Sequence, residues 1–322
     1  HPDFGVRENP SLEVLLKEAV HGAFDETGID PELIEKGFIG NFVGSCFVNQ
    51  AHLGSMLAKV HDSLAYKPLT RVEGACASGG LAVLCAIDSL QAGCDVVLAT
   101  GVEVQTTVSA REGADFLARA AHYDTEREID DFTFPCLFAR RGKAYKEAFG
   151  ATSVDFDHVT VKAYTNGNKN PKAHMKNVSM NMEKAAPSER NGFFLANETY
   201  REHLKISDCS QVSDGASALV LATEEGLRRL GVSIEDCIEI LSYGHATGPL
   251  GQVDDLTELG TSRRAAEAMY RDSGLTPQDI QVAEVHDCFS LTEVMMYEAL
   301  GFASRGEGAQ LARSGETGLE GR

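Results

Sequence analysis

The stretch VEGACASGGLAVLCAIDSL, from Val72 to Leu90, carries the clearest fold signal in this chain. It places Cys76 after a predicted strand near Leu69–Glu73 and directly before an apolar run. The run from Leu81 to Leu90 is apolar on nearly all faces, which predicts a buried helix. The valine-rich stretch CDVVLATGVEV, Cys94–Val104, follows and is typical of a buried parallel strand. Strand, turn, helix and strand together predict a βαβ unit in an α/β fold.

The position of Cys76 at a predicted helix start suggests a nucleophile. A buried helix directs its unpaired N–H groups and positive dipole end toward whatever lies at its N-terminus. We therefore expect the pKa of the Cys76 thiol to be lowered. The small residues Ala75, Ala77, Gly79 and Gly80 leave room for a substrate beside the sulfur. Spacing alone does not separate this interpretation from a buried structural cysteine.

A second turn that carries reactive groups lies in VAEVHDCFSLTE. Here His286, Asp287 and Cys288 follow a predicted strand, and Ser290 with Glu293 forms a capping-box pattern that predicts the next helix start. Polar residues at the carboxyl end of a strand in an α/β sheet are where active sites gather. A histidine there can donate to a developing oxyanion, and a cysteine can carry a proton.

Length, composition and charge narrow the class of protein. The 322 residues are enough for about two domains. Hydrophobic residues make up 43% and charged residues 24%, so the chain can bury a substantial core. The net charge of −19 argues against a nucleic-acid-binding protein and against binding to an anionic membrane surface. A local group of lysines and arginines could still hold an anionic small molecule.

The cysteine pattern favours an intracellular protein. The eight cysteines are scattered singly, with no CxxC pair, so neither a disulfide framework nor a zinc site is expected. A reducing compartment is the simpler interpretation: the cytoplasm in a bacterium, or the mitochondrion or peroxisome in a eukaryote. No run of about 18 apolar residues occurs, so no membrane span is expected. The first residues also lack the layout of a signal peptide.

The rest of the chain predicts two α/β halves and one insertion. A helix is predicted over Leu12–Thr27, and the pattern loosens from about Thr106 to Lys205, where we expect an inserted loop domain. Strand patterns return at Val212–Glu225 and Cys237–Gly248, and again just before His286. We therefore predict an N-terminal half over residues 1–225 and a C-terminal half over residues 226–322.

Taken together, these motifs resemble the thiolases, and specifically those like the thiolase domain of sterol carrier protein x. EGACASGG resembles the nucleophile turn, QVSDGASALVL the strand that closes the N-terminal half, and EVHDCFSLTEVMMYEALGF the HDCF segment of that branch. SGLTPQDI, just ahead of it, also fits. The resemblance covers most of the chain in the right order, and the combination of HDCF with a cysteine turn is fairly specific.

The resemblance implies a fold, a chemistry and a set of roles. The fold would be two βαβαβαββ halves in an α-β-α-β-α arrangement with an inserted loop domain that holds coenzyme A, usually paired as a homodimer. Cys76 would be the acyl-accepting nucleophile, His286 the oxyanion-hole donor and Cys288 the acid/base for the second substrate. The activity would be acyl transfer between 3-ketoacyl-CoA and acetyl-CoA in lipid metabolism. Coenzyme A would be substrate and product, with no permanently bound cofactor and no metal.

The chain departs from the family at both ends, which leaves alternatives open. The GHP and CxG segments of thiolases are expected after LARSGETGLEGR, and the opening strand is not found, so we expect an incomplete C-terminal half. His245 in YGHATGPLG precedes HDCF, so it is a structural or pocket-lining residue and not the GHP histidine. One alternative is an acyl-CoA side-chain aldolase that works with a partner protein. Another is a non-catalytic thiolase homologue that binds coenzyme A or lipid.

Overall fold

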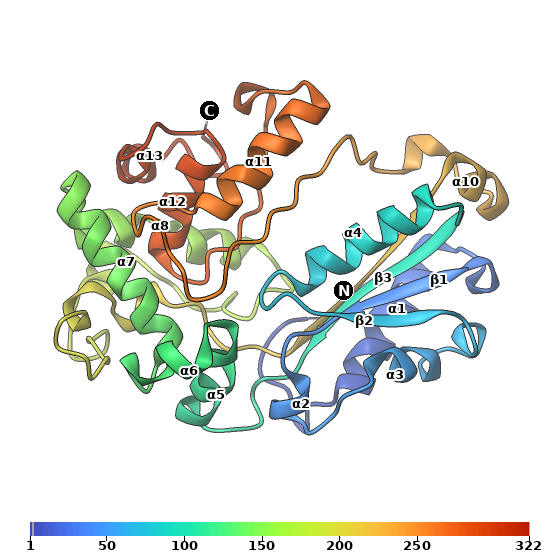
Figure 1. Cartoon of the computed structure of the whole chain (residues 1–322), viewed down its shortest axis with the longest axis horizontal. Helices are drawn as coiled ribbons and strands as arrows, with labels where there is room; N and C mark the ends of the chain where they lie inside the picture. The colour runs from blue at the N-terminus through green and yellow to red at the C-terminus, as the bar shows by residue number, and fades with distance from the viewer. Residues whose placement is uncertain (2, 322) are drawn as a thin grey trace. The chain divides into compact units, whose positions relative to one another are not determined.

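The computed structural model describes residues 1 and 3–321, which form two compact units (Figure 1). Unit 1 comprises His1–Phe116, Lys172–His174 and Val212–Glu239. Unit 2 comprises Leu117–Pro171, Met175–Gln211 and Ile240–Arg322. This division follows contacts within the chain, and the boundary between residues 225 and 226 that the sequence suggests remains a prediction.

Unit 1 is built on a four-stranded sheet in the order β2-β1-β3-β4. The strands are β1 (Lys36–Gly40), β2 (Leu69–Val72), β3 (Val96–Glu103) and β4 (Gly215–Ala222). β1 pairs in parallel with β2 and β3, and β4 is antiparallel to β3. Gly40, the last residue of β1, stands opposite Val72 of β2 and Gly101 of β3. The carboxyl ends of the three parallel strands therefore lie at one edge of the sheet.

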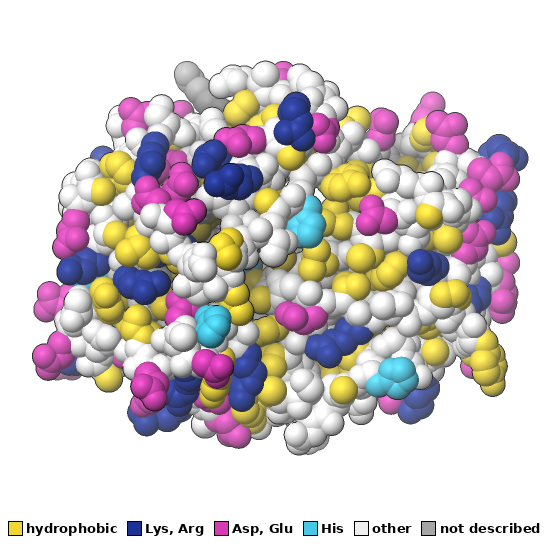
Figure 2. Space-filling model, viewed as in Figure 1, with side chains coloured by type: hydrophobic (Ala, Val, Ile, Leu, Met, Phe, Trp, Pro, Cys, Tyr) yellow, Lys and Arg dark blue, Asp and Glu magenta, His cyan; other side chains and the backbone are white. Residues whose placement is uncertain are grey.

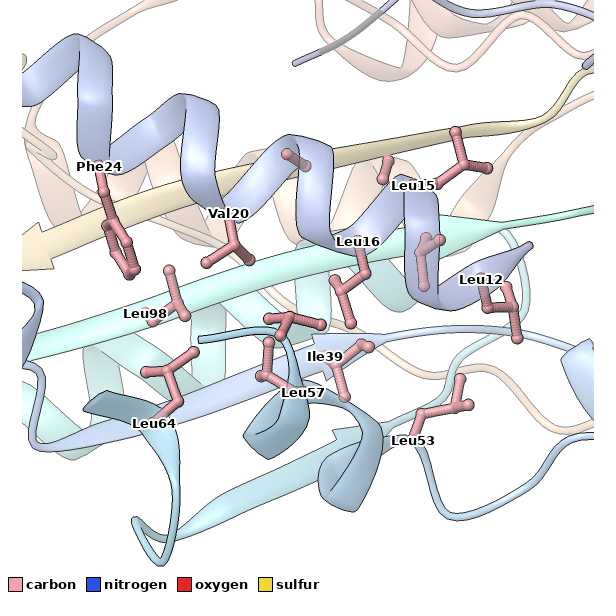
Figure 3. Packing of buried hydrophobic residues seen from close by; sticks show 14 of the residues in the cluster. Leu12, Leu15, Leu16, Val20, Phe24, Ile39, Leu53, Leu57, Leu64 and Leu98 are labelled. Atoms are coloured by element: carbon pink, nitrogen blue, oxygen red, sulfur yellow. The ribbon is translucent and has the colours of Figure 1, made fainter. Parts of the chain in front are cut away.

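One face of this sheet is covered by α1 (Leu12–Thr27), whose bounds agree with the prediction. Ser11 caps the helix by accepting from the N–H of Val14, and Gly28 ends it with a φ of 65°, a left-handed conformation that suits glycine. Figure 3 shows side chains of α1, among them Leu16, turned toward Leu98 of β3 within the main core of the unit. Helical spacing of apolar residues thus places one stripe of α1 on the sheet.

The opposite face of the sheet is covered by α4 (Ser78–Gln91). Ala82 and Ala86 pack against Phe38, Val97 and Ala99 of the sheet. The prediction that this helix is buried on nearly all faces is wrong, because its buried residues lie only on the stripe toward the strands. Figure 2 accordingly shows hydrophobic side chains at the surface over α4. A single sheet can cover only one side of a helix.

The remaining elements of unit 1 are short. They are η1 (Pro31–Leu33), α2 (Gly44–Phe47), α3 (Leu53–Lys59), η2 (Asp62–Leu64), most of α5 (Ala110–Leu117), α10 (Glu224–Leu230) and η7 (Ile234–Asp236). Leu53 and Leu57 of α3 complete the α1 side of the core.

Among the described residues of unit 2, the named secondary-structure elements are all helices, joined by irregular segments. Its longer helices are α7 (Thr133–Phe149), α8 (Ser153–Lys169), α11 (Gly260–Ser273), α12 (Ser290–Ala299) and α13 (Gly308–Ser314). The short ones are η3 (Ala118–Ala120), α6 (Tyr123–Glu126), η4 (Arg127–Ile129), α9 (Met182–Ala185), η5 (Arg201–His203), η6 (Ile206–Asp208) and η8 (Pro277–Asp279). Val294 and Met295 of α12 pack with Tyr145 and Phe156 to form the main core of the unit. Most residues of α12 are buried, so the helix is a fixed support for residues 286–288, which precede it.

Two predicted strands do not form in the part of the chain that the structure describes. The stretches at Cys237–Gly248 and before His286 have no strand hydrogen-bond ladder there. Their apolar side chains face outward: Ile238 is 96% exposed and Val282 is 81% exposed. A strand needs a neighbour that takes its N–H and C=O groups, and these stretches have none among the described residues. No helix within residues 1 and 3–321 is long and apolar enough to cross a membrane.

Candidate active site

Cys76 lies in a tightly bonded turn between β2 and α4. The Oγ of Ser78 accepts from the N–H of Gly74 at 3.0 Å and donates to the carbonyl of Ala75 at 2.6 Å. Glu73 accepts from the N–H of Ala75 at 2.5 Å. Ala75 has a φ of 50°, a left-handed conformation that is uncommon for residues other than glycine. The hydrogen bonds of Ser78 and Glu73 thus hold Ala75, next to the cysteine, in a backbone conformation that non-glycine residues rarely adopt. Such conformations are common at functional sites.

The turn sits close to the neighbouring strand because Gly40 has no side chain. A Cβ at this position would come within 2.4 Å of the carbonyl oxygen of Ser78. A side chain there would push the first turn of α4 away from the end of β1. Gly40 therefore places the start of α4, and with it Cys76, at the carboxyl edge of the three parallel strands.

The expected lowering of the Cys76 pKa is not what the structure shows. Desolvation by surrounding protein atoms raises the pKa of the Cys76 thiol, and the negative charge of Glu103 raises it further. The N-cap of α4 is Ala77, so Cys76 lies before the cap, two residues ahead of the first helical residue, Ser78. Cys76 as a whole residue is exposed, whereas the desolvation of its thiol disfavours the thiolate.

The second predicted turn, His286 to Cys288, lies in unit 2 and leads into α12. His286 is exposed, and Cys288 is half-buried with its Sγ 3.7 Å from the Oγ1 of Thr292. The carbonyl of Cys288 accepts from the N–H of Ser210 at 3.0 Å, and the next residue, Phe289, forms an antiparallel bridge with Cys209. Backbone bonds to the segment around Cys209 therefore hold the turn from one side.

The predicted capping box between Ser290 and Glu293 is wrong. The N-cap of α12 is Phe289, and no side chain caps the helix. The Oγ of Ser290 instead donates to the carboxylate of Asp208 at 2.8 Å. Glu293 is buried and pairs with Lys162. Charged partners from distant parts of unit 2 outcompete the local capping bonds because a buried carboxylate needs strong partners.

Asp287, between the histidine and the cysteine, is also perturbed. Burial raises the pKa of its carboxyl group, and the nearby charge of Glu293 raises it further. Lys162 and His286 act in the opposite direction. Lys162 and Tyr297 both donate to Glu293, and the Tyr297 hydroxyl oxygen accepts from the Oγ1 of Thr317 at 3.1 Å. The charges of Glu293 and Lys162 connect this network to Asp287 of the HDCF turn, and Lys162 comes from α8, far away in the sequence.

A pocket in unit 2 lies away from the HDCF turn. It has a volume of about 320 Å³ and is lined by Arg141, Thr247, Thr261 and Arg264, among other residues. Neither His286 nor Cys288 lines it. His245 does not line it either; this histidine is exposed, with its Nε2 3.4 Å from the Oγ1 of Thr247.

The three residues expected to carry the chemistry thus belong to different parts of the molecule. Cys76 lies in unit 1, whereas His286 and Cys288 lie two residues apart in unit 2. Their meeting in one active site stays a prediction. Sequence reasoning missed Glu103, although a carboxylate at the end of the buried strand VVLATGVE was a usable signal.

The fold of unit 1 defines an α/β protein with a cysteine in the turn between a parallel strand and a helix. The family description "Thiolase, N-terminal domain" matches residues 3–225, and "Thiolase C-terminal domain-like" matches residues 242–322. The chain therefore belongs to the thiolase family, which confirms the resemblance drawn from the motifs and the predicted fold class.

Individual relatives agree with this assignment. The chain is 30% identical over 321 residues to the acetyl-CoA acetyltransferase of Methanothermobacter thermautotrophicus, covering 99% of this chain and 79% of the relative. It is 28% identical to human sterol carrier protein 2, covering 99% of this chain and 57% of that protein. Among solved structures, an Ltp2-ChsH2(DUF35) aldolase has the same fold, with a TM-score of 0.75 at 24% identity over 99% of this chain and 80% of the solved one.

Proposed function

We propose that this protein transfers acyl groups between coenzyme A thioesters through an acyl-cysteine on Cys76. The observation that carries the proposal is the Cys76 turn, which places an exposed cysteine at the carboxyl ends of the three parallel strands. The side chains of Ser78 and Glu73 hold this turn through hydrogen bonds to the backbone of Ala75. Covalent catalysis of this kind divides one difficult acyl transfer into two easier steps. Membership of the thiolase family and likeness to an acetyl-CoA acetyltransferase support the choice of reaction.

In the proposed reaction the HDCF turn supplies a hydrogen-bond donor and an acid/base group. His286 donates a hydrogen bond to the thioester oxygen as negative charge develops on it. Cys288 moves the proton at the α-carbon of the second substrate during carbon–carbon bond formation or cleavage. Coenzyme A is substrate and product in this scheme, and the homodimer and the intracellular location expected from the sequence belong to the same proposal.

The experiment is mass spectrometry of the intact protein after incubation with acetyl-CoA or acetoacetyl-CoA. We expect one acyl adduct, which peptide mapping places on Cys76. The Cys76→Ser variant should form none, whereas the matched control Cys237→Ser should form it as the wild type does. Cys237 suits this purpose because it is another exposed thiol of unit 1. An adduct that survives Cys76→Ser would refute the assignment of the nucleophile.

Parallel incubations separate the alternatives. Cleavage of a 3-hydroxyacyl-CoA to a carbonyl product and a shorter acyl-CoA, without any acyl-enzyme, would indicate an aldolase. Saturable binding of coenzyme A with neither adduct nor turnover would indicate a binding protein. Either result would refute acyl transfer as the function of this chain.

A further inference from the structure

The hydroxyl of Thr292 contacts the thiol of Cys288 within unit 2. The Sγ of Cys288 lies 3.7 Å from the Oγ1 of Thr292, a hydrogen-bonding distance for sulfur, which is a larger atom than oxygen. Thr292 is the third residue of α12 and is only 5% exposed. A buried hydroxyl without a hydrogen-bond partner is costly. The thiol of Cys288 provides that partner, so the contact stabilises both side chains.

This partner is an unusual one for a threonine in a helix. The Oγ1 of a helical threonine commonly donates to the carbonyl three or four residues earlier. The carbonyl of Phe289, three residues earlier, accepts from the backbone N–H of Thr292 at 2.8 Å. The carbonyl of Cys288, four residues earlier, accepts from the N–H of Ser210 at 3.0 Å. Both carbonyls thus accept backbone bonds, while the Thr292 hydroxyl lies at hydrogen-bonding distance from the sulfur.

The backbone that joins the two residues is fixed by its own contacts. Phe289, which follows Cys288, is buried, and its ring centroid lies 4.6 Å from that of Phe138 in α7. Ser290, the first residue of α12, is buried as well. A cysteine side chain on a fixed backbone can still occupy different staggered rotamers. The hydrogen bond to Thr292 favours the rotamer that places the Cys288 sulfur beside the hydroxyl.

We infer that Thr292 is a positioning residue for the thiol of Cys288. The inference rests on the proposed function, in which Cys288 moves the proton at the α-carbon of the second substrate, and it adds the residue that directs the sulfur. A hydroxyl can donate a hydrogen bond to a thiolate and can accept one from a thiol. Thr292 therefore holds the sulfur before and after the proton is taken up, and it gains or loses no proton itself.

The test compares Thr292→Val with Thr292→Ser. Valine keeps the shape of threonine without the hydroxyl, whereas serine keeps the hydroxyl without the methyl group. In incubations with acetyl-CoA, mass spectrometry follows acylation of Cys76, and formation of acetoacetyl-CoA follows the carbon–carbon step. Alkylation by iodoacetamide, resolved for Cys288 by peptide mapping, reports its thiolate without any turnover. Thr292→Ala also lacks the hydroxyl and should behave as Thr292→Val does, so the test survives poor folding of the valine variant.

The inference predicts that the two half-reactions separate. Thr292→Val should slow carbon–carbon bond formation by about ten- to a hundredfold, the usual effect of losing a hydrogen bond to a charged group. Acylation of Cys76 should be unchanged, because Cys288 takes no part in it. Alkylation of Cys288 at pH 8 should slow several-fold, since a thiolate without a hydroxyl donor forms less readily. Thr292→Ser should restore both affected rates toward those of the wild type.

Thr160→Val is the matched control. Thr160 is a buried threonine of α8 whose hydroxyl donates to the backbone carbonyl of Ser207 at 3.2 Å, so its loss should leave all three rates unchanged.

Three results would overturn the inference. They are unchanged carbon–carbon bond formation in Thr292→Val, equal slowing of both half-reactions, and a serine variant that behaves as the valine variant does. Absence of acyl-enzyme in the wild type would instead refute the proposed function. Alkylation would then still decide the inference, because equal rates at Cys288 in the wild type and Thr292→Val would overturn it independently.

Discussion

Replacement of Lys205 by methionine should strongly destabilise unit 2. The Lys205 side chain is 1% exposed, and its Nζ lies 2.7 Å from the Oδ1 of Asp157 and 2.7 Å from the Oδ1 of Asp208. Both carboxylates are buried. Asp208 also accepts from Ser290, the first residue of α12, so this cluster anchors the helix that carries the HDCF turn. Methionine fills a similar volume but leaves two buried negative charges without a cation.

The magnitude follows from the geometry. At 2.7 Å and an effective dielectric constant of about 20, each pair attracts by about 6 kcal/mol before desolvation is counted. Desolvation of the lysine offsets much of this attraction. Removing one partner of a buried ionic cluster typically lowers the free energy of unfolding by about 3–5 kcal/mol, because the remaining charges stay buried. We expect a loss in that range at pH 7.

Urea unfolding followed by far-ultraviolet circular dichroism measures this loss. Lys59→Met is the control, since Lys59 and Glu13 form an exposed pair at 2.9 Å whose loss should cost less than about 1 kcal/mol. Adding Asp157→Asn to Lys205→Met should restore part of the stability. Equal unfolding free energies for Lys205→Met and the wild type would refute the reasoning.

The effect of pH provides a second check on the same variant. Burial already raises the pKa of Asp157, and Lys205 opposes this rise. Without the lysine the pKa of Asp157 rises further above its unfolded value, so the folded variant binds more protons than the unfolded chain. Stability then increases as pH falls. The deficit of Lys205→Met should therefore shrink between pH 7 and pH 5, and a deficit that grows would contradict this account.

Three further predictions concern the site. His286→Ala should lower turnover by roughly a hundredfold or more with little change in substrate binding, because one oxyanion donor is lost; a higher Michaelis constant alone would show a binding role. Cys288→Ala should leave acylation of Cys76 largely intact in mass spectrometry while carbon–carbon bond formation stops, and equal loss of both steps would overturn its assigned role. Gly40→Ala should lower the free energy of unfolding by about 1–3 kcal/mol, because the new Cβ meets the Ser78 carbonyl; an unchanged melting temperature would contradict the close approach.

Patterns in the local sequence were sufficient to predict the features that depend only on residues close together in the chain. The sequence alone predicted α1 with its bounds, because the apolar spacing, the capping serine and the terminating glycine all lie within the helix or next to it. It likewise placed Cys76 between a strand and a helix, and the motifs around Cys76 and His286 were enough to identify the family. These features depend on hydrophobic periodicity and on short motifs, which the linear chain carries in full.

Tertiary structure decided what depends on residues distant in the chain. The direction of the Cys76 pKa follows from burial and from Glu103, which the fold brings to the same edge of the sheet. Ser290 and Glu293 fit a capping pattern, yet they bind Asp208 and Lys162 because buried carboxylates and cations find each other across unit 2. The apolar stretches around Ile238 and Val282 form no strand here, because a strand exists only when a second strand supplies its hydrogen bonds.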